Sequence, residues 1–180
     1  MKWMIASDIH GSAHFCRLLL SAMEREGAER LVLLGDVLYH GPRNDLPEGY
    51  APKEVIALLN GVADRILCVR GNCDTEVDQM VLHFPLLSEY AWIMEEGRTY
   101  YFAHGHKAGP DDPPPMPKGS LLFSGHTHVA GVFRKEGFVN LNPGSVSIPK
   151  ENTPQGYILA EGGSFSFRTL EGNEYLNYSL

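Results

Sequence analysis

Hydrophobic positions in the first half of the chain form short apolar runs that are separated by amphipathic segments. Three of these runs, residues 3–6, 31–34 and 66–69, have the length of a strand and contain no charged side chain. Continuous apolar runs of this length are typical of parallel strands that are buried on both faces. The pattern therefore predicts three parallel strands.

The segments between these runs have helical periodicity. In the first segment, hydrophobic residues recur three to four positions apart, Ser12 is placed to cap a helix and Gly27 to end it. In the second segment, Val55 and Leu59 lie about one helical turn apart and follow Pro52, a residue favoured in the first turn of a helix. The first half is therefore predicted to have a β-α-β-α-β arrangement.

The second half consists of strand-like stretches that meet at short turns, at residues 95–97, 135–137 and 161–163. Such turns imply hairpins and antiparallel pairing. Residues 40–50 and 107–119 are predicted loops, and the second of them contains five prolines. No internal repeat and no long linker divides the sequence. The sequence therefore predicts that residues 1–180 form a single α/β domain, in which two mixed sheets pack face to face with helices outside.

Composition narrows the class of protein further. Among the 180 residues, 43% are hydrophobic and 21% are charged, which argues against disorder. The net charge of -7 disfavours attraction to nucleic acid or to anionic membranes, so we expect neither as a partner. No apolar run approaches membrane-spanning length, and three cysteines without a framework spacing fit a reducing compartment. Together with the absence of a signal-peptide pattern, this predicts a cytoplasmic protein.

Five polar motifs each follow a strand-like run directly. They are Asp8-Ile9-His10, Gly35-Asp36, Gly71-Asn72-Cys73-Asp74, His104-Gly105-His106 and Gly125-His126-Thr127-His128. In open α/β sheets, ligands bind beyond the carboxyl ends of the strands. We therefore expect these motifs to converge, although they are far apart in the sequence.

The motifs contain two carboxylates, one amide and four imidazoles that are competent to bind metals: Asp8, His10, Asp36, Asn72, His104, His126 and His128. A mixed oxygen and nitrogen set suits first-row divalent metals. Seven ligands are too many for one ion but suit two ions that share a carboxylate, and Asp36 is the natural bridge. Each motif alone has an ordinary explanation, such as a turn at Asn72. The prediction depends on their combination and order.

This ordered set of motifs resembles the calcineurin-like metallophosphoesterases and, more narrowly, their small bacterial phosphodiesterases. The stretches that carry the resemblance lie between about residues 3 and 150, at positions 7–11, 34–37, 40–44, 69–74, 76–80 and 142–147. The resemblance implies a four-layer α-β-β-α sandwich of two mixed sheets flanked by helices. It also implies an enzyme that hydrolyses phosphodiesters.

The resemblance further implies how the ligands divide. Asp8, His10, Asp36 and His128 would hold one ion, and Asp36, Asn72, His104 and His126 would hold the other. Manganese is the ion usually associated with such enzymes. A hydroxide that bridges the two metals would then attack the phosphorus of a small phosphodiester, while Asn72 and His104 offset the developing negative charge.

Cys73 departs from the family pattern, which commonly has a histidine after the Gly-Asn pair to protonate the leaving group. A thiol with a pKa of about 8.5 is poorly matched to that role. We therefore predict a preference for diesters with good leaving groups over alkyl phosphomonoesters, with Cys73 as a catalytic residue. A thiol that only fills space beside the metals is the alternative.

Other polar residues near the motifs have two interpretations each. His40 and Arg43 follow Asp36 in a loop where a guanidinium can bind a substrate phosphate, or can simply form a surface salt bridge. His106 either supports a ligand or faces solvent. Asp74 either orients the motif around it or is an ordinary turn residue.

Two other classes of function compete with this hypothesis. A noncatalytic scaffold, such as the retromer subunit that shares this fold, tends to lose ligands, whereas all seven positions here carry metal-competent side chains. A nuclease or a cyclic nucleotide phosphodiesterase is the alternative among enzymes, and the absence of a basic stripe weighs against long nucleic acid. The uncovered strands make a homo-oligomer an expectation.

Overall fold

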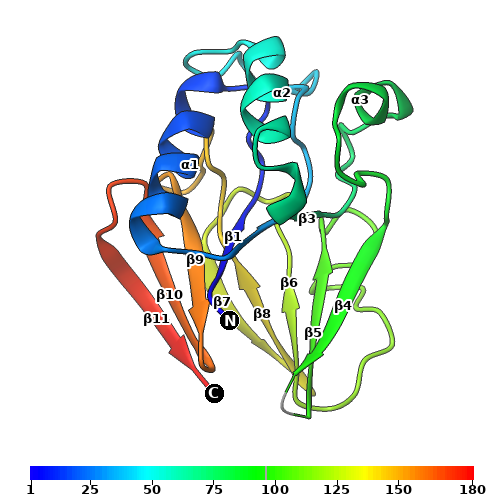
Figure 1. Ribbon diagram of the computed structural model, residues 1–180. Helices are drawn as coiled ribbons and strands as arrows, with labels where there is room; N and C mark the ends of the chain where they lie inside the picture. Colours follow the sequence, from blue (N-terminus) through cyan, green and yellow to red (C-terminus); the bar gives the residue numbers. More distant parts are fainter. Residues whose placement is uncertain (96) are drawn as a thin grey trace.

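Two mixed β-sheets lie face to face in the computed structural model, which describes residues 1–95 and 97–180 (Figure 1). The six-stranded sheet has the order β11-β10-β9-β1-β2-β3. Its strands are β1 (Trp3–Ala6), β2 (Arg30–Leu33), β3 (Ile66–Cys68), β9 (Gly156–Glu161), β10 (Ser164–Thr169) and β11 (Glu174–Ser179). Strands β1, β2 and β3 are parallel, as predicted, and β9 joins β1 in antiparallel orientation.

The five-stranded sheet has the order β4-β5-β6-β8-β7. Its strands are β4 (Tyr90–Glu95), β5 (Arg98–Ala103), β6 (Ser120–Phe123), β7 (Gly131–Lys135) and β8 (Phe138–Asn142). The hairpins β4–β5, β7–β8 and β9–β10 are antiparallel, although Glu96 in the first predicted turn lies outside the described residues. The prediction of antiparallel pairing was incomplete, because β6 runs parallel to both β5 and β8. The 104–119 loop leaves the carboxyl end of β5 and carries the chain, without a helix, back to the end of the sheet at which β5 began.

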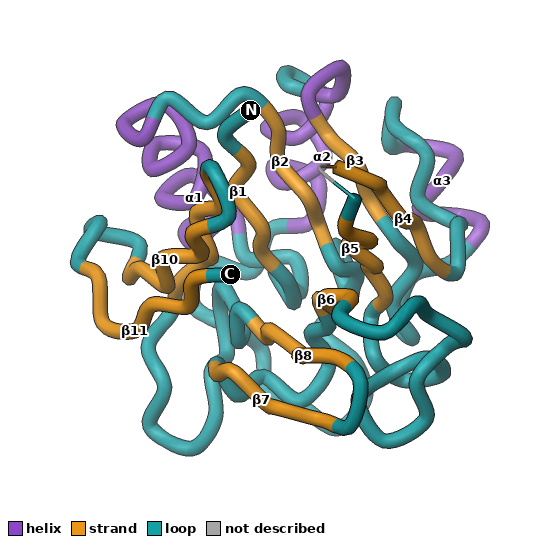
Figure 2. The backbone as a smooth tube through the Cα atoms, turned by 90° about the horizontal axis from the view of Figure 1, so that it is seen from below, coloured by secondary structure: helices purple, strands orange, loops and turns teal. Residues whose placement is uncertain are grey.

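Helices α1 (Ala13–Glu26) and α2 (Pro52–Asn60) cover the outer face of the six-stranded sheet (Figures 1 and 2). A 3₁₀ turn (Ala63–Arg65) and helix α3 (Glu76–Val81) complete the helical elements of the described ranges. The predicted caps of α1 are confirmed, since Ser12 Oγ accepts a hydrogen bond from Phe15 N at 3.2 Å and Gly27 adopts a left-handed conformation. None of these helices is long and apolar enough to span a membrane.

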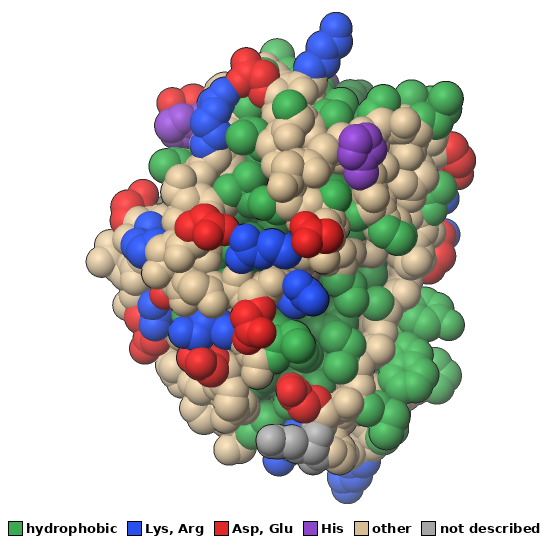
Figure 3. All heavy atoms as spheres, in the orientation of Figure 1, with side chains coloured by type: hydrophobic (Ala, Val, Ile, Leu, Met, Phe, Trp, Pro, Cys, Tyr) green, Lys and Arg blue, Asp and Glu red, His purple; other side chains and the backbone are tan. Residues whose placement is uncertain are grey.

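The α/β class with two mixed sheets is confirmed, but the layer outside the five-stranded sheet is a loop. Ala108 and Met116 of the proline-rich segment pack against Tyr101 and Leu122 of that sheet. On the same side, Tyr90, Trp92 and Met94 of β4 are more than half exposed and help to line a groove of about 860 Å³. Figure 3 shows hydrophobic side chains gathered along this side of the molecule. The groove contains none of the seven candidate ligands.

Aromatic side chains hold the two sheets together. Trp3 of β1 lies against Phe102 of β5, with ring centroids 6.2 Å apart, and Phe123 of β6 lies 5.6 Å from Phe165 of β10. Each such side chain contributes roughly 1.5–3 kcal/mol when it is fully buried. This interface aligns the carboxyl ends of β1, β2 and β3 with those of β5, β6 and β8.

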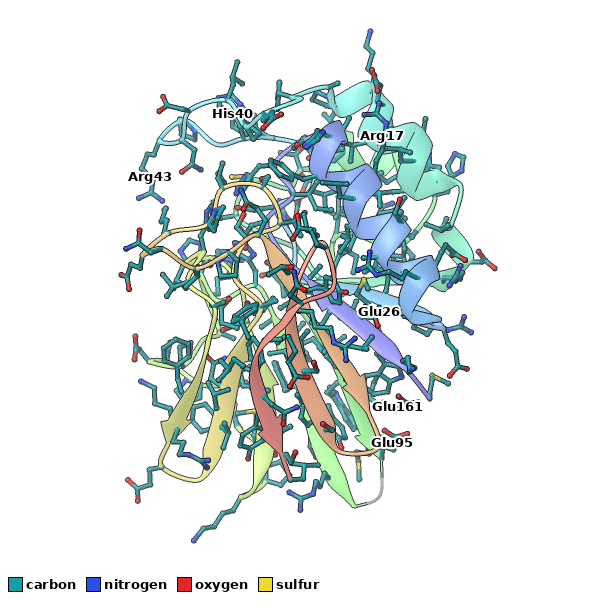
Figure 4. The ribbon with its side chains drawn as sticks, turned by 90° about the vertical axis from the view of Figure 1, so that its left-hand side faces the viewer. Arg17, Glu26, His40, Arg43, Glu95 and Glu161 are labelled. Carbon is teal, nitrogen blue, oxygen red and sulfur yellow. The ribbon has the colours of Figure 1, made fainter. Side chains whose placement is uncertain are left out.

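Glu26 connects the end of α1 to the six-stranded sheet (Figure 4). Its carboxylate accepts hydrogen bonds from Tyr157 Oη at 2.8 Å and from Arg168 Nη1 at 2.8 Å, and its side chain is 11% exposed. Burial alone would raise the pKa of Glu26, but the bonds from Tyr157 and Arg168 outweigh burial and lower it. The ionised form is therefore the one that stabilises the fold.

We expect Glu26→Gln to lower the free energy of unfolding by about 1–2 kcal/mol at pH 7. Because the pKa of Glu26 is lower in the folded state, its contribution is complete above the unfolded pKa of about 4.3 and disappears as the pH falls through the folded value. The difference from the wild type should therefore shrink at pH 3. Urea unfolding at both pH values measures it, and a penalty that is the same at both would contradict this account.

Glu161→Gln is the matched control. Glu161 pairs with Lys2 Nζ at 3.1 Å, but its side chain is 62% exposed. Surface pairs of this kind contribute little, so we expect a change below about 0.5 kcal/mol at either pH.

Candidate metal centre

All seven candidate ligands lie in loops that follow the carboxyl ends of strands of the two sheets. Three loops of the six-stranded sheet carry Asp8, His10, Asp36 and Asn72, and two loops of the five-stranded sheet carry His104, His126 and His128. These loops lie at the upper ends of the parallel strands in Figure 1. The predicted convergence of the motifs is confirmed by the distances between their side chains.

One group of donor atoms surrounds the carboxylate of Asp8. Its Oδ1 lies 3.4 Å from His10 Nε2 and 3.2 Å from His128 Nε2, and these two nitrogens lie 3.3 Å apart. Asp8 is fully buried, and its Oδ1 has no hydrogen-bond partner. A buried carboxylate oxygen normally has a partner, because burying an unpaired charge is costly. Divalent metal binding would satisfy this oxygen, so these three residues fit a cation.

A second group surrounds His104. Its Nε2 lies 3.0 Å from Asn72 Oδ1, 3.2 Å from His126 Nδ1 and 3.4 Å from Asp36 Oδ2. Asp36 Oδ2 also lies 3.8 Å from His10 Nε2, so it stands between the two groups. The remaining oxygen of Asp36 accepts a hydrogen bond from Cys73 N at 2.8 Å. This position fits the bridging role that the sequence predicts for Asp36.

Three of the four histidines are oriented by backbone carbonyl groups. Each places its Nδ1 2.7–2.8 Å from a carbonyl oxygen, and the pairs are His10 with Tyr39, His104 with Leu34, and His128 with Ile148. A carbonyl can only accept, so the proton must be on Nδ1. Nε2 then points toward the other donors, where the neutral imidazole can bind a metal.

The backbone is strained at most of the candidate ligands. Seven non-glycine residues in the described ranges have a positive φ, and five of them are candidate ligands: Asp8 (59°), His10 (50°), Asp36 (54°), His126 (66°) and His128 (61°). Such conformations cost on the order of 1 kcal/mol each and concentrate at functional sites. Two glycines allow the close approach of neighbouring loops, because a side chain at Gly71 would collide with Asp36 and one at Gly125 with Asp8.

The electrostatics keep both carboxylates ionised. Burial by itself would raise the pKa of Asp8, but His10, His104 and His128 hold it well below its usual range. Burial would also raise the pKa of Asp36, but the hydrogen bond and the charge of His104 outweigh burial and lower it. Burial would lower the pKa of His104, but its contact with Asp36 and the charge of Asp8 raise it to about 9. Without a metal, the protonated His104 neutralises part of this negative charge, and a divalent cation would take the place of its Nε2 proton.

Asp74 holds two of the ligand loops together, which resolves its two interpretations. Its carboxylate accepts hydrogen bonds from Asp36 N at 2.8 Å, Val37 N at 2.9 Å and Gly71 N at 2.7 Å. His106 is partly buried, and its ring lies near those of His104 and His126, with centroids 5.3 and 6.1 Å away.

Sequence reasoning assigned no role to the residues that support the Asp8 loop from behind. Ser145 Oγ and Ser147 Oγ donate to the backbone oxygen of Asp8 at 2.8 and 3.1 Å, and Asn142 Nδ2 donates to Gly125 O at 2.9 Å. The signal that could have revealed them is their position directly after β8, at the same edge of the sheet as the five motifs.

A cavity of about 360 Å³ opens onto the candidate ligands. Its lining residues are Asp36, Gly41, Pro42, Arg43, Asn44, Asn72, Cys73, His126, Thr127, His128 and Lys150. Arg43 lies on the wall of this cavity, and its contact with a substrate stays a prediction. His40 is not part of the lining, because its ring packs against Tyr39 and Tyr50 at 4.8 and 5.3 Å. The structure thus separates the two residues that were predicted to contact substrate.

A two-sheet α/β sandwich with donor-bearing loops at one edge of its sheets is the architecture of a metallophosphoesterase. A model of the calcineurin-like phosphoesterase superfamily domain matches residues 1–163. The chain belongs to this superfamily.

Named relatives agree with this assignment. The chain is 48% identical to Phosphodiesterase YfcE of Escherichia coli strain K12 over 170 residues, 94% of this chain and 92% of the relative. The solved structure of E. coli YfcE, a phosphoesterase, has a TM-score of 0.96 at 43% identity and covers 99% of both chains. Vps29 of Entamoeba histolytica, solved with Zn²⁺, covers 99% of both chains with a TM-score of 0.60, and its 16% identity shows the fold alone.

We expect Asp74→Ala to lower the free energy of unfolding by about 3 kcal/mol, because three buried backbone N–H groups lose an ionised acceptor. Asp74→Asn should cost less, because its amide oxygen can still accept hydrogen bonds from some of these N–H groups. Urea unfolding measures both effects. Asp78→Ala, which removes the capping box of α3, is the control and should cost about 1 kcal/mol. An Asp74→Ala penalty no larger than that of Asp78→Ala would contradict the bridging role.

Proposed function

We propose that this protein is a phosphodiesterase that hydrolyses small phosphodiesters with the help of two divalent metal ions, most simply manganese. The observation that carries the proposal is the convergence of seven oxygen and nitrogen donors from five loops of both sheets. The 48% identity to a protein named Phosphodiesterase YfcE supports the diesterase class. A small phosphodiester is the proposed partner, and a cytoplasmic location and a homo-oligomer stay predictions.

The two groups of donors around Asp8 and His104 correspond to the two proposed ion sites. Asp8, His10 and His128 would hold one ion, while Asn72, His104 and His126 would hold the other, with Asp36 shared between them. Divalent ions at such sites lower the pKa of water and neutralise the charge of a phosphate. The residues fit this role because Asp8 Oδ1 is buried without a hydrogen-bond partner and ring nitrogens of the histidines face one another.

The chain itself contributes positioning and charge. Asn72 and His104 are proposed to lie beside the nonbridging oxygens of the substrate and to offset the negative charge that develops there. Arg43, on the cavity wall, would bind a phosphate group of the substrate. Cys73 lines the same cavity, and its Sγ accepts a hydrogen bond from Asn72 Nδ2 at 3.3 Å. Burial and the neighbouring charge of Asp36 raise the pKa of the Cys73 thiol, so it is uncharged at neutral pH.

A noncatalytic scaffold requires a different test from metal binding. Binding of a metal by the candidate ligands would not by itself establish catalysis, because some metal sites in proteins are purely structural. Turnover of a phosphodiester is the property that separates the two functions. The net charge of -7 continues to weigh against long nucleic acid as the substrate.

We expect a chelator such as EDTA to abolish turnover of a chromogenic nitrophenyl phosphodiester and manganese to restore it. Asp36→Ala should reduce turnover by about 10²- to 10³-fold or more and should also lower the bound manganese per chain, because the shared ligand is lost. Elemental analysis measures the metal content independently of activity. Asp45→Ala is the control, since Asp45 is an exposed residue of the 40–50 loop. Undiminished turnover in excess chelator would refute the proposal.

Replacing Cys73 by histidine tests the proposed preference for diesters. An imidazole at this position can protonate an alkoxide leaving group, so we expect the ratio of monoesterase to diesterase rates to rise by about tenfold or more. Cys73→Ser, which supplies no such acid, should leave the ratio near its original value. If the histidine variant also left the ratio unchanged, Cys73 would not determine the preference.

A further inference from the structure

Two cationic side chains line the cavity besides the candidate ligands. Arg43 enters it from the 40–50 loop, and Lys150, which sequence reasoning did not single out, enters it from the segment that follows β8. Neither side chain has an ion-pair or hydrogen-bond partner among the described residues. By contrast, Lys107 and Lys135 pair with acidic residues elsewhere on the surface. Arg43 and Lys150 therefore leave positive charge on the cavity wall.

The backbone holds Lys150 in a fixed position. Its N–H donates to His128 O at 3.0 Å, and its own carbonyl oxygen accepts from Thr153 N at 3.0 Å and Thr153 Oγ1 at 2.8 Å. Glu151 and Asn152 between them both have a positive φ, at 52° and 59°. This is the geometry of a type I′ turn, which is unfavourable for residues other than glycine, asparagine and aspartate. The turn thus ties Lys150 to a candidate ligand loop despite local strain.

The loop that carries Arg43 is held against the other wall of the cavity. Asn44 Nδ2 donates to His40 O at 2.8 Å, and Gly41, with φ of 82°, lies close to Cys73. Figure 4 shows Arg43 projecting from this loop on the side away from helix α1. The two cations thus come from different segments, each anchored beside the candidate ligands.

A simple phosphodiester does not account for this charge. On the proposed function, on which this inference rests, two divalent ions bring four positive charges, and the carboxylates of Asp8 and Asp36 cancel two of them. A singly charged diester and one deprotonated water cancel the other two. Arg43 and Lys150, both solvent-exposed residues at the rim of the cavity of about 360 Å³, then have no counter-charge from the substrate.

We propose that Lys150 is a specificity-determining residue which, together with Arg43, binds a second anionic group of the substrate. That group is a phosphate ester separate from the diester that is cleaved. The described lining of the cavity contains no phenylalanine, tyrosine or tryptophan, and its imidazole rings belong to the candidate ligands His126 and His128, so no ring is left on which a nucleobase can stack. The substrate class is therefore a phosphodiester of a phosphorylated sugar or polyol.

The test uses two chromogenic substrates that differ by one phosphate. The first is the p-nitrophenyl diester of glycerol 3-phosphate, and the second is the same molecule with an additional phosphate at the other terminal hydroxyl. With manganese present, wild-type kcat/KM should favour the second substrate by about tenfold or more, mainly through KM, and added salt should weaken this preference. Lys150→Ala and Arg43→Ala should each reduce the preference by about tenfold, whereas Lys150→Arg should keep most of it.

Lys118→Ala is the matched control, because Lys118 is an exposed lysine that precedes β6 and is not part of the cavity lining. A binding measurement accompanies the kinetics. Calorimetry on the manganese-loaded protein should give tighter binding of glycerol 1,3-bisphosphate than of glycerol 3-phosphate, and Lys150→Ala should remove the difference. Equal binding of the two ligands to the wild type, or the same preference in Lys150→Ala and Lys118→Ala, would overturn the proposal.

Failure of the proposed function would look different. In that case the wild type would cleave neither substrate in the presence of manganese. If both substrates were cleaved at equal rates, the diesterase function would stand and the second anionic site would be wrong.

Discussion

The alignment of the two sheets is the constraint on which the site depends. Asp8, Asp36 and Asn72 come from one sheet, while the histidines at 104, 126 and 128 come from the other, so no single sheet contains either proposed ion site. The aromatic interface around Trp3, Phe102 and Phe123 sets this alignment by burying large side chains from both sheets. A shift of one sheet by a single residue, about 3.3 Å, would separate donor atoms of the two sheets that now lie 3.0–3.4 Å apart.

Forming the candidate site costs free energy, and contacts around the site offset this cost. Two carboxylates are removed from water, and five candidate ligands have a left-handed backbone. Both features are unfavourable in isolation. The hydrogen bonds that Asp74 accepts from the ligand loops, and those that Ser145 and Ser147 donate to them, help to offset this cost. Cation binding would offset the cost further by neutralising the buried charge. The fold and the proposed function therefore depend on the same few loops.

The sequence predicted those parts of the structure that follow from local patterns. The parallel strands β1 to β3, the caps of α1 and the convergence of the motifs all follow from apolar runs, Ser12, Gly27 and the rule that ligands gather at strand ends. The parallel placement of β6 between β5 and β8 could not be predicted, because a loop without periodicity carries the chain between them. Lys150 and the supporting serines were missed because their roles arise only from a turn and from backbone contacts across about 140 positions.

The central claim is that the donors of both sheets enclose a pair of cations. Anomalous scattering from crystals soaked in manganese measures this directly. The account predicts two peaks about 3.5–4 Å apart, one beside Asp8 and one beside His104, with Asp36 between them. A single peak, or no peak, in crystals soaked in saturating manganese would contradict it.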